Sequence, residues 1–560
     1  MIEHLIFFLY ILVFISSAIG YGVIFSKIFE KEFLKLNLGY IGIIGIFFLT
    51  FISAITSFFY PHNFYHNTIL HLVGLVSFLF FIKDNVVKKN FVLCLVMISL
   101  MILGVFIFKN HDDFPYYHLT YALNLSENGF LIGTGAFGHG FRTPSSMFYY
   151  HSILYMPGIK YFLFHTGPFF ILYFFNIIIL SNIIEKLKKK NFDFIYFLSL
   201  LSFIFINIVF YRISEHGTDR SSQILLIIIF LLFFEILYSK EKNKNFVINL
   251  FFLIIALAAS IKVLYYIYFS LALFLFLEKK INFNYFFKQF TFLFIIFLFS
   301  SVFISKSFFS TGCLVYPAEK TCFEKFEWSI PKSTVKKMST HYEWWAKSGG
   351  APNYKHKLPK EEYIKNFNWV QNWYKKHFIG KISDTLGGIL LITLIVILLF
   401  SGPSNKKIKR KNFKIYCVIP LLFLLEWFLN HPSMRYGGYI LFALPVFIIT
   451  SRYLEKKKIE YDKIYYRSIF LILITLTIYN LRNLDRIINE INFYDYDIIS
   501  SPYFHVPDVK SEIITSSNDL AIYKPKNNMC WASKTPCSYN PHIRLKKYLW
   551  MKMIYKSDDE

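Results

Sequence analysis

The sequence predicts an all-α polytopic membrane protein of about 12–14 transmembrane helices, with further helices and loops on its outer face. Two observations predict this fold class. Hydrophobic residues make up 55% of the 560 residues and charged residues only 17%, whereas soluble domains carry about 25% charged residues. Apolar runs of about twenty residues, the length that crosses a bilayer as a helix, also recur along the whole chain.

The expected spans follow these apolar runs in order. The first run, near 5–24, has no convincing small-residue cleavage site, so we expect it to be a retained span rather than a signal peptide. The segment 245–278 is compatible with two helices or with one long tilted helix. The spans are placed near residues 4–26, 38–60, 66–82, 90–109, 168–185, 194–211, 221–238, 245–260, 263–278, 286–305, 386–402, 414–430, 437–451 and 467–482.

Short lysine-rich connections separate the spans. Examples are "KDNVVKK", "EKLKKKN", "SKEKNKN", "SNKKIKRKNFK" and "RYLEKKKIEYDK". The positive-inside rule places such connections in the cytoplasm, and the span assignment puts them all on one face. Both termini then lie on the opposite, outer face. The net charge of +25 is explained by these connections, so it implies contact with anionic lipid and no nucleic-acid partner.

Spans and connections divide the chain into parts of different character. The expected parts are N-terminal transmembrane helices at 1–109, an outer loop with an acidic motif and juxtamembrane helices at 110–167, transmembrane helices at 168–305, a large outer loop at 306–385, transmembrane helices at 386–482 and an outer C-terminal tail at 483–560.

Four of the six cysteines form two close pairs on the expected outer face. Cys313 and Cys322 lie in the large loop, and Cys530 and Cys537 lie in the tail. Close pairs on an outer face favour disulfide bonds and an oxidising compartment such as the periplasm. A zinc site is the alternative, although no Cys-x-x-Cys or accompanying His motif is present.

The segment "NHDDFPYYH" follows the span near 90–109 directly. It places Asp112 and Asp113 at the outer membrane interface between His111 and His118. Two adjacent carboxylates repel each other, and a metal ion or a substrate cation would relieve this repulsion. The pair therefore suits a general base or a ligand of Mg²⁺ or Mn²⁺. A solvated helix end is the alternative. The segment 114–165 mixes apolar residues with Gly, Pro, His and Arg142, which predicts amphipathic helices on the membrane surface.

Other polar groups are expected to converge on the same outer region. Lys262 interrupts an apolar run, where a charge is costly and marks a functional position unless it snorkels to the interface. Arg435, between two spans, suits a phosphate group or a lipid headgroup. The segment "YRISEHGTDR" contributes Glu215, His216, Asp219 and Arg220.

The segments "HDDFPYYH", "GCLVYP", "HPSMRYGGY" and "CWASKTPC" together make the chain resemble the GT-C superfamily of membrane glycosyltransferases. That superfamily includes protein O-mannosyltransferases and the aminoarabinose transferase of lipid A. The resemblance implies a GT-C-like fold with a catalytic acidic residue in an outer loop just after a span. It differs in one respect, because three expected spans precede the one before the acidic pair.

The resemblance also implies a function. A sugar would pass from a polyprenyl-phosphate donor in the lipid bilayer to a glycan or lipid acceptor, on the periplasmic side of the bacterial inner membrane. Asp112 or Asp113 would act as base, with Mg or Mn as a possible metal, and the cations and polar groups named above would bind substrate. An O-antigen polymerase or ligase, or a polysaccharide-lipid transporter, is the alternative.

Overall fold

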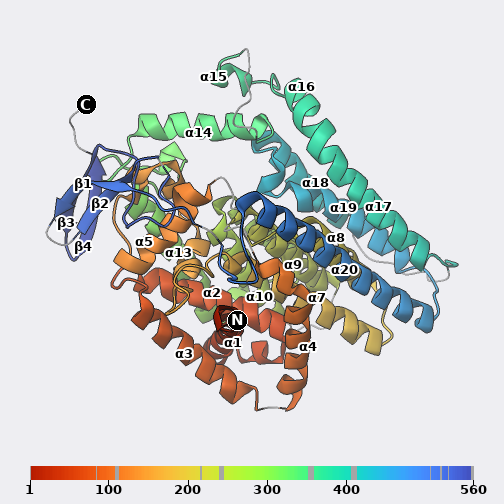
Figure 1. Cartoon of the computed structure of the whole chain (residues 1–560). Coiled ribbons are helices and arrows are strands. Elements are labelled where there is room, and N and C mark those ends of the chain that lie inside the picture. The colour runs from red at the N-terminus through yellow and green to blue at the C-terminus, as the bar shows by residue number, and fades with distance from the viewer. Residues whose placement is uncertain are drawn as a thin grey trace.

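The structure is a computed structural model that describes residues 2–83, 85–106, 113–214, 217–238, 245–350, 358–404, 413–504, 506–517, 520–527 and 529–556. Helices form one thick bundle, and a small β-structured unit lies at its edge (Figure 1). Eight helical segments are long and apolar enough to cross a membrane, so this is a multi-pass helical membrane protein. They are α1 (Ile2–Phe29), α2 (Leu38–Thr56), α3 (Phe64–Phe81), α7 (Thr166–Lys188), α9 (Asp219–Tyr238), α13 (Phe290–Thr311), Val370–Phe400 and α20 (Tyr461–Tyr494).

The remaining predicted spans fall on shorter apolar helices. At Lys262 the backbone is extended, with φ −140°, which splits the predicted segment 245–278 into two helical pieces. The shorter helices are α4 (Asn85–Met101), α8 (Phe194–Val209), α10 (Asn245–Ile261), α11 (Leu271–Leu277) with the preceding 3₁₀ turn η6 (Val263–Ser270), α18 (Phe413–Asn430) and α19 (Gly438–Leu454).

Burial separates central helices from peripheral ones. The most apolar window of α9 is 89% buried and those of α2 and α7 are 83% buried, so these helices form the centre. The corresponding share is 33% for α13 and α20. These two peripheral helices expose large apolar side chains such as Phe294 and Leu473. Such a surface suits lipid tails rather than water.

Glycines let α1, α2 and α3 approach each other closely. A Cβ atom added at Gly45 of α2 would lie 1.7 Å from the Ala18 carbonyl oxygen of α1. One added at Gly20 of α1 would lie 1.8 Å from the Gly74 carbonyl oxygen of α3. Membrane helices commonly pack through small residues in this way, because lipid supplies no hydrophobic force between them.

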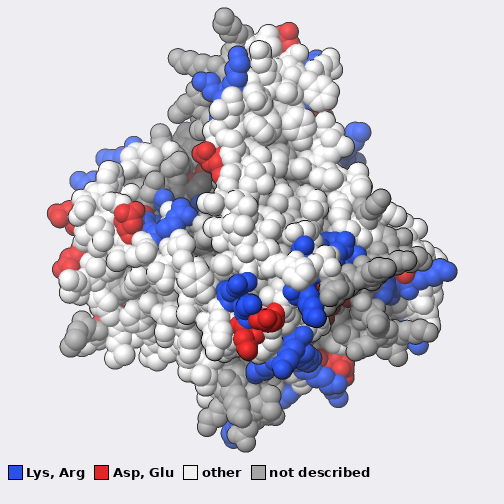
Figure 2. Space-filling view, turned by 90° about the vertical axis from the view of Figure 1, so that its right-hand side faces the viewer, with Lys and Arg blue, Asp and Glu red and all other residues white. Residues whose placement is uncertain are grey.

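Lysine-rich connections meet at one end of the bundle, called here the basic face. The connection after α7 contacts the one after α19: the Phe194 amide donates to Glu455, and Lys190 lies over the Tyr461 ring. Lys458 in turn donates its amide to the Pro403 carbonyl, which follows α17 (Ser383–Phe400). The right-hand side of Figure 1 faces the viewer in Figure 2, where Lys and Arg side chains gather with some Asp and Glu, mainly in the lower half.

The segment after the acidic motif differs from the sequence prediction. It forms a π-helical turn η3 (Phe114–His118), α5 (Leu119–Asn128) and α6 (Ser146–Ser152). These helices are not amphipathic surface helices, since residues 119–126 and 146–152 are all buried. Packing of α6 against α2, α7 and α10 buries one side, and the C-terminal tail covers α5. Several of their polar side chains form hydrogen bonds inside the protein, such as Ser126, whose hydroxyl donates to the Ser152 carbonyl.

The C-terminal tail is β-structured, so the prediction of an all-α chain is wrong there. Strands β1 (Ser511–Ser517) and β2 (Leu520–Pro525) pair antiparallel, as do β3 (Ile543–Tyr548) and β4 (Met551–Lys556). The tail docks on the segment after the acidic motif: the Ile554 amide donates to the Ile132 carbonyl at 2.9 Å, and the Ile132 amide to the Lys552 carbonyl at 3.0 Å.

The remaining helices belong to the connections. A short helix, α12 (Phe283–Lys288), precedes α13, and α15 (Lys360–Tyr363) and α16 (Val370–Trp373) precede α17. The large loop contributes α14 (Lys332–Lys347), which lies across one end of the bundle in Figure 1.

Candidate functional site

A cavity of about 1320 Å³ lies at the end of the bundle opposite the basic face, called here the cavity face. The connections that the sequence placed on the outer face meet here. The lining residues come from 113–148, 212–223, 259–266, 303–317, 337–350, 430–439 and the single residues Lys360 and Lys381. A large site is thus assembled from segments far apart in sequence.

Asp219 joins two cations at the centre of this cavity. The Lys262 ammonium lies 2.5 Å from Asp219 Oδ1, and Arg435 Nε lies 2.7 Å from Asp219 Oδ2. Asp219 begins α9, where the helix dipole favours a negative charge. Its side chain is 15% exposed, so the two pairs are largely shielded from water. One carboxylate therefore fixes the position of both cations.

Arg435 connects Asp219 with the acidic motif. Its Nη2 atom lies 3.9 Å from Asp113 Oδ2, and its guanidinium lies over the ring of Trp345 at 5.1 Å. Burial lowers the pKa of Arg435, but the charge of Asp219 and its neighbours outweighs burial, so the pKa lies above its usual value. The side chain stays positively charged between two carboxylates.

Local structure explains where Arg435 stands. It lies in a 3₁₀ turn, η9 (Met434–Tyr436), between α18 and α19. Gly437 follows with φ +107°, a conformation that favours glycine and lets the chain turn into α19. Two tryptophans hold the turn: Trp427 donates its indole N–H to the Ser433 carbonyl and Trp373 to the Pro432 carbonyl.

The structure brings together every predicted catalytic and substrate-binding residue that it describes. All of them line the cavity: Asp113, His118, Arg142, Asp219, Arg220, Lys262 and Arg435. His111, Asp112, Glu215 and His216 lie outside the described residues. His118 is only 4% exposed and packs edge-on against Tyr117. Burial raises the pKa of Tyr117, and the charge of Asp113 adds to this, so its phenol is a hydrogen-bond donor at neutral pH.

Sequence reasoning missed several residues of the cavity wall. Lys337 and His341 lie on α14, Lys360 begins α15, and Tyr316 lies in the loop after α13. Among the described residues the lining contains eight Lys and Arg but three Asp and Glu, an excess of five positive charges. The amphipathic pattern of α14 was the available signal, because such a helix covers something with its apolar side.

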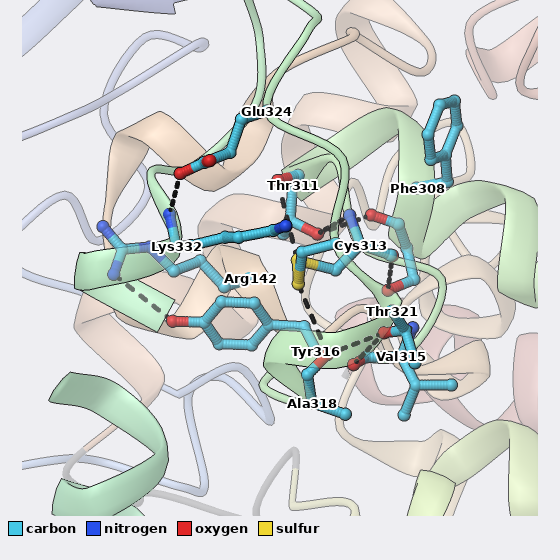
Figure 3. The surroundings of a disulfide bond; sticks show 12 residues. Arg142, Phe308, Thr311, Cys313, Val315, Tyr316, Ala318, Thr321, Glu324 and Lys332 are labelled. Carbon is cyan, nitrogen blue, oxygen red and sulfur yellow. Dashed lines mark hydrogen bonds between the residues drawn. A yellow bond between two sulfur atoms is a disulfide. The ribbon is translucent and has the colours of Figure 1, made fainter. Parts of the chain in front are cut away.

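A disulfide bond shapes the wall that holds Tyr316. Cys313 and Cys322 are joined with an S–S distance of 2.05 Å, and Cys530 and Cys537 are joined in the tail. Within the first loop the Leu314 amide donates to the Thr321 carbonyl at 3.0 Å. As Figure 3 shows, the Tyr316 hydroxyl faces the Arg142 guanidinium, whose Nη1 atom donates to it at 3.4 Å.

The expected Mg or Mn ligands are Asp112 and Asp113, of which the structure describes only Asp113. No cluster of three or more His, Cys, Asp or Glu side chains among the described residues has the arrangement of a metal site. Asp113 and Asp219 instead face the cation Arg435. We therefore derive no chemical step through a metal.

The sequence matches one family model, described as a domain of unknown function (DUF8201), over residues 1–443. The match contains every residue that lines the cavity and ends before α20 and the β-structured tail. No curated protein and no solved structure matches the chain.

Proposed function

The chain belongs to the DUF8201 family, and we propose that it is a membrane glycosyltransferase that moves a sugar from a polyprenyl-phosphate carrier to a glycan or lipid acceptor of the cell envelope. The observation that supports this proposal is the charge of the cavity. An excess of cations lines a 1320 Å³ space at the end of membrane helices, next to Asp113. A phosphate on a lipid tail is the kind of ligand that such a place attracts.

The proposed reaction is a direct displacement at the anomeric carbon. A hydroxyl oxygen of the acceptor forms a bond to this carbon while the bond between the carbon and the phosphate oxygen breaks. The acceptor proton passes to Asp113, or to its neighbour Asp112, as general base. The product is the glycosylated acceptor with inverted configuration, and polyprenyl phosphate leaves with the electron pair.

The cations would stabilise the departing phosphate. Lys262 and Arg435 are already held by Asp219, at 2.5 and 2.7 Å, so no reorganisation is needed when negative charge develops. Asp219 is then a positioning residue rather than a substrate ligand. Arg220, which also lines the cavity, adds a third positive charge.

Apolar residues of the lining suit a lipid-linked donor. Val263 and Leu264 of η6 and Phe303 and Ile304 of α13 line the cavity, and both elements also expose apolar side chains, such as Ile267 and Phe297, on the outside of the bundle. The donor's tail would stay beside these helices in the bilayer. In this proposal the cavity face lies in the periplasm and the basic face in the cytoplasm.

Sugar transfer by the purified protein in lipid nanodiscs tests the proposal. The donors are polyprenyl-phosphate sugars and the acceptor is a crude pool of envelope glycolipids. Loss of the base lowers rates by roughly 10²–10⁴-fold. We expect a loss of this size in Asp113→Asn or Asp112→Asn, with wild-type transfer in the control Asp462→Asn at the start of α20.

Other outcomes separate the alternatives. Wild-type transfer in both motif variants would remove the aspartates from the mechanism and favour the polymerase or ligase. Absence of transfer from every donor would contradict the donor class and favour the transporter. Loss of activity with EDTA, and its return with Mg²⁺ or Mn²⁺, would assign a metal to the motif.

A further inference from the structure

The cations that line the cavity differ in their partners. Asp219 and Asp113 accompany Arg435 and Lys262. Three other cations of the lining, called here the cationic wall, are Arg142, Lys337 and Lys360. Within the described part of the chain no carboxylate pairs with any of these three side chains. The positive charge of the cationic wall is therefore available to a ligand.

Two hydrogen bonds hold Arg142 in place, and its guanidinium has further N–H groups that can donate to a ligand. Its Nε atom donates to the Gly135 carbonyl at 3.1 Å, and its Nη1 atom donates to the Tyr316 hydroxyl at 3.4 Å. A guanidinium carries five N–H donors, and among the described residues Nη2 has no acceptor. Its planar fork matches the oxygens of a phosphate or a carboxylate.

The partner of Arg142 is fixed by a covalent link. Tyr316 is 3% exposed and lies inside the loop closed by Cys313 and Cys322. The Thr321 hydroxyl also ties this loop together, since it accepts from the Val315 amide at 3.1 Å. A site whose side chains are already ordered loses less entropy when a ligand binds.

Lys337 and Lys360 extend the cationic wall toward solvent. Both side chains are exposed, and Lys360 Nζ lies 3.1 Å from His341 Nδ1 on α14. Exposed cations at the mouth of a cavity raise the local concentration of anions. Buried and exposed parts of the wall thus favour the same class of ligand.

We propose that the cationic wall is a second anion subsite, which binds a phosphate or carboxylate group on the acceptor. This proposal rests on the proposed function only where it identifies the bound anion as part of the acceptor, because binding of an anion does not require sugar transfer. Donor phosphate and acceptor anion then contact different cations of the lining, and the acceptor hydroxyl is held near Asp113. A neutral glycan leaves the cationic wall without a partner.

Equilibrium binding to the full chain in phosphatidylcholine nanodiscs tests this subsite. The probes are glucose 6-phosphate, glucuronate and glucose, which share a ring and differ in charge. We expect both anionic sugars to bind at least about tenfold more tightly than glucose, as a charge-assisted hydrogen bond predicts. The phosphate and carboxylate probes show which of the two oxyanions is preferred.

Substitutions in the cationic wall test whether its side chains bind the anionic sugars. Arg142→Gln is expected to weaken the anionic probes about tenfold and to leave glucose unchanged. The charge-retaining Arg142→Lys should lose less, and the pair Lys337→Gln with Lys360→Gln should mainly reduce the salt dependence of binding. Lys336→Gln, on the same helix but not in the cavity lining, is the matched control.

Two results would overturn the subsite. One is equal binding of glucose and the anionic sugars. The other is unchanged anion binding by the Arg142→Gln variant, once a thermal unfolding transition has shown that this variant is folded. The transfer assay separates this proposal from the proposed function. Arg142-dependent anion binding without any transfer keeps the subsite and removes the glycosyltransferase. Sugar transfer to neutral acceptors that does not depend on Arg142 keeps the glycosyltransferase and removes the subsite.

Discussion

At the scale of single residues, Asp219 organises the cavity. It is the only described carboxylate that contacts both Lys262 and Arg435 at distances of 2.7 Å or less. Without it, two partly buried cations would face each other across the start of α9. Removing one partner of a shielded ion pair costs more than the pair contributes, because the remaining charge is left without compensation.

We therefore expect Asp219→Asn to lower the free energy of unfolding by about 2 kcal/mol or more, a value reduced from the fully buried case because the cations keep some solvent contact. Thermal unfolding in detergent measures it. Glu32→Gln, which breaks an exposed pair with Lys35, is the control and should change little. Equal stability of Asp219→Asn and wild type would contradict this role.

Two buried histidines behind the cavity give a prediction for pH. Burial lowers the pKa of His151 to about 3, with a further contribution from His165. Burial also lowers the pKa of His165 to about 3. Both rings are neutral in the folded protein, whereas an unfolded chain protonates histidine below about pH 6.5. The unfolded state thus binds more protons between these values.

Stability should consequently fall as pH falls from about 6.5 toward 3, by up to about 1.4 kcal/mol per pH unit for each ring. Unfolding temperatures across this range measure the slope. Replacing both rings, as in the double variant His151→Gln and His165→Gln, should flatten the slope whatever its effect on stability at neutral pH. An unchanged slope would show that other groups dominate acid unfolding.

At the scale of elements, close glycine contacts determine how α1, α2 and α3 pack. In Gly45→Leu the new side chain would meet the Ala18 carbonyl of α1 at 1.7 Å from its first carbon, so the helices must separate. We expect a strong loss of folded protein in fluorescence-detected size-exclusion chromatography. Gly388→Leu in α17 is the matched control, because no atom lies within 4 Å of an added Cβ there. A normal profile for Gly45→Leu would refute the tight packing.

Helices were the elements that the sequence predicted best. Apolar length located a helix at each expected span, and eight helical segments are long enough to cross a membrane, since a run of lipid-soluble residues has few other stable conformations. Whether the segment 245–278 is broken was left open by the sequence, and the burial of α5 and α6 was not predicted. This burial depends on α2, α7, α10 and the tail, which come from distant parts of the chain. Strands β1–β4 are short and polar, and their pairing carries little periodic signal.

The candidate site was predictable to a similar extent. Asp113, Lys262 and Arg435 stood out because charge at the end of an apolar run is costly. Lys337 and Lys360 did not, because exposed lysines in a long loop usually have no special role. Their place in the cavity wall follows from the path of the large loop across the cavity face, which tertiary contacts alone determine.

At the scale of the whole molecule, the two ends of the bundle are chemically different. Short lysine-rich connections gather on the basic face, and the long connections form the cavity on the other. If the basic face is cytoplasmic, a membrane-impermeant maleimide should label Lys336→Cys in intact cells and Lys189→Cys only after permeabilisation. The wild type, whose free Cys94 is buried and Cys417 partly buried, gives the background. The reverse labelling pattern would invert the topology.

The docked tail has a consequence for biosynthesis. Thr535 donates a hydrogen bond to Glu127, although the two residues are 408 positions apart in the chain. A ribosome that adds about 5–20 residues per second needs roughly 20–80 s between them. During that time the segment after the acidic motif is present without its cover. The cavity face is therefore completed last, and a nascent chain that stalls before the tail leaves this wall uncovered for quality-control proteases.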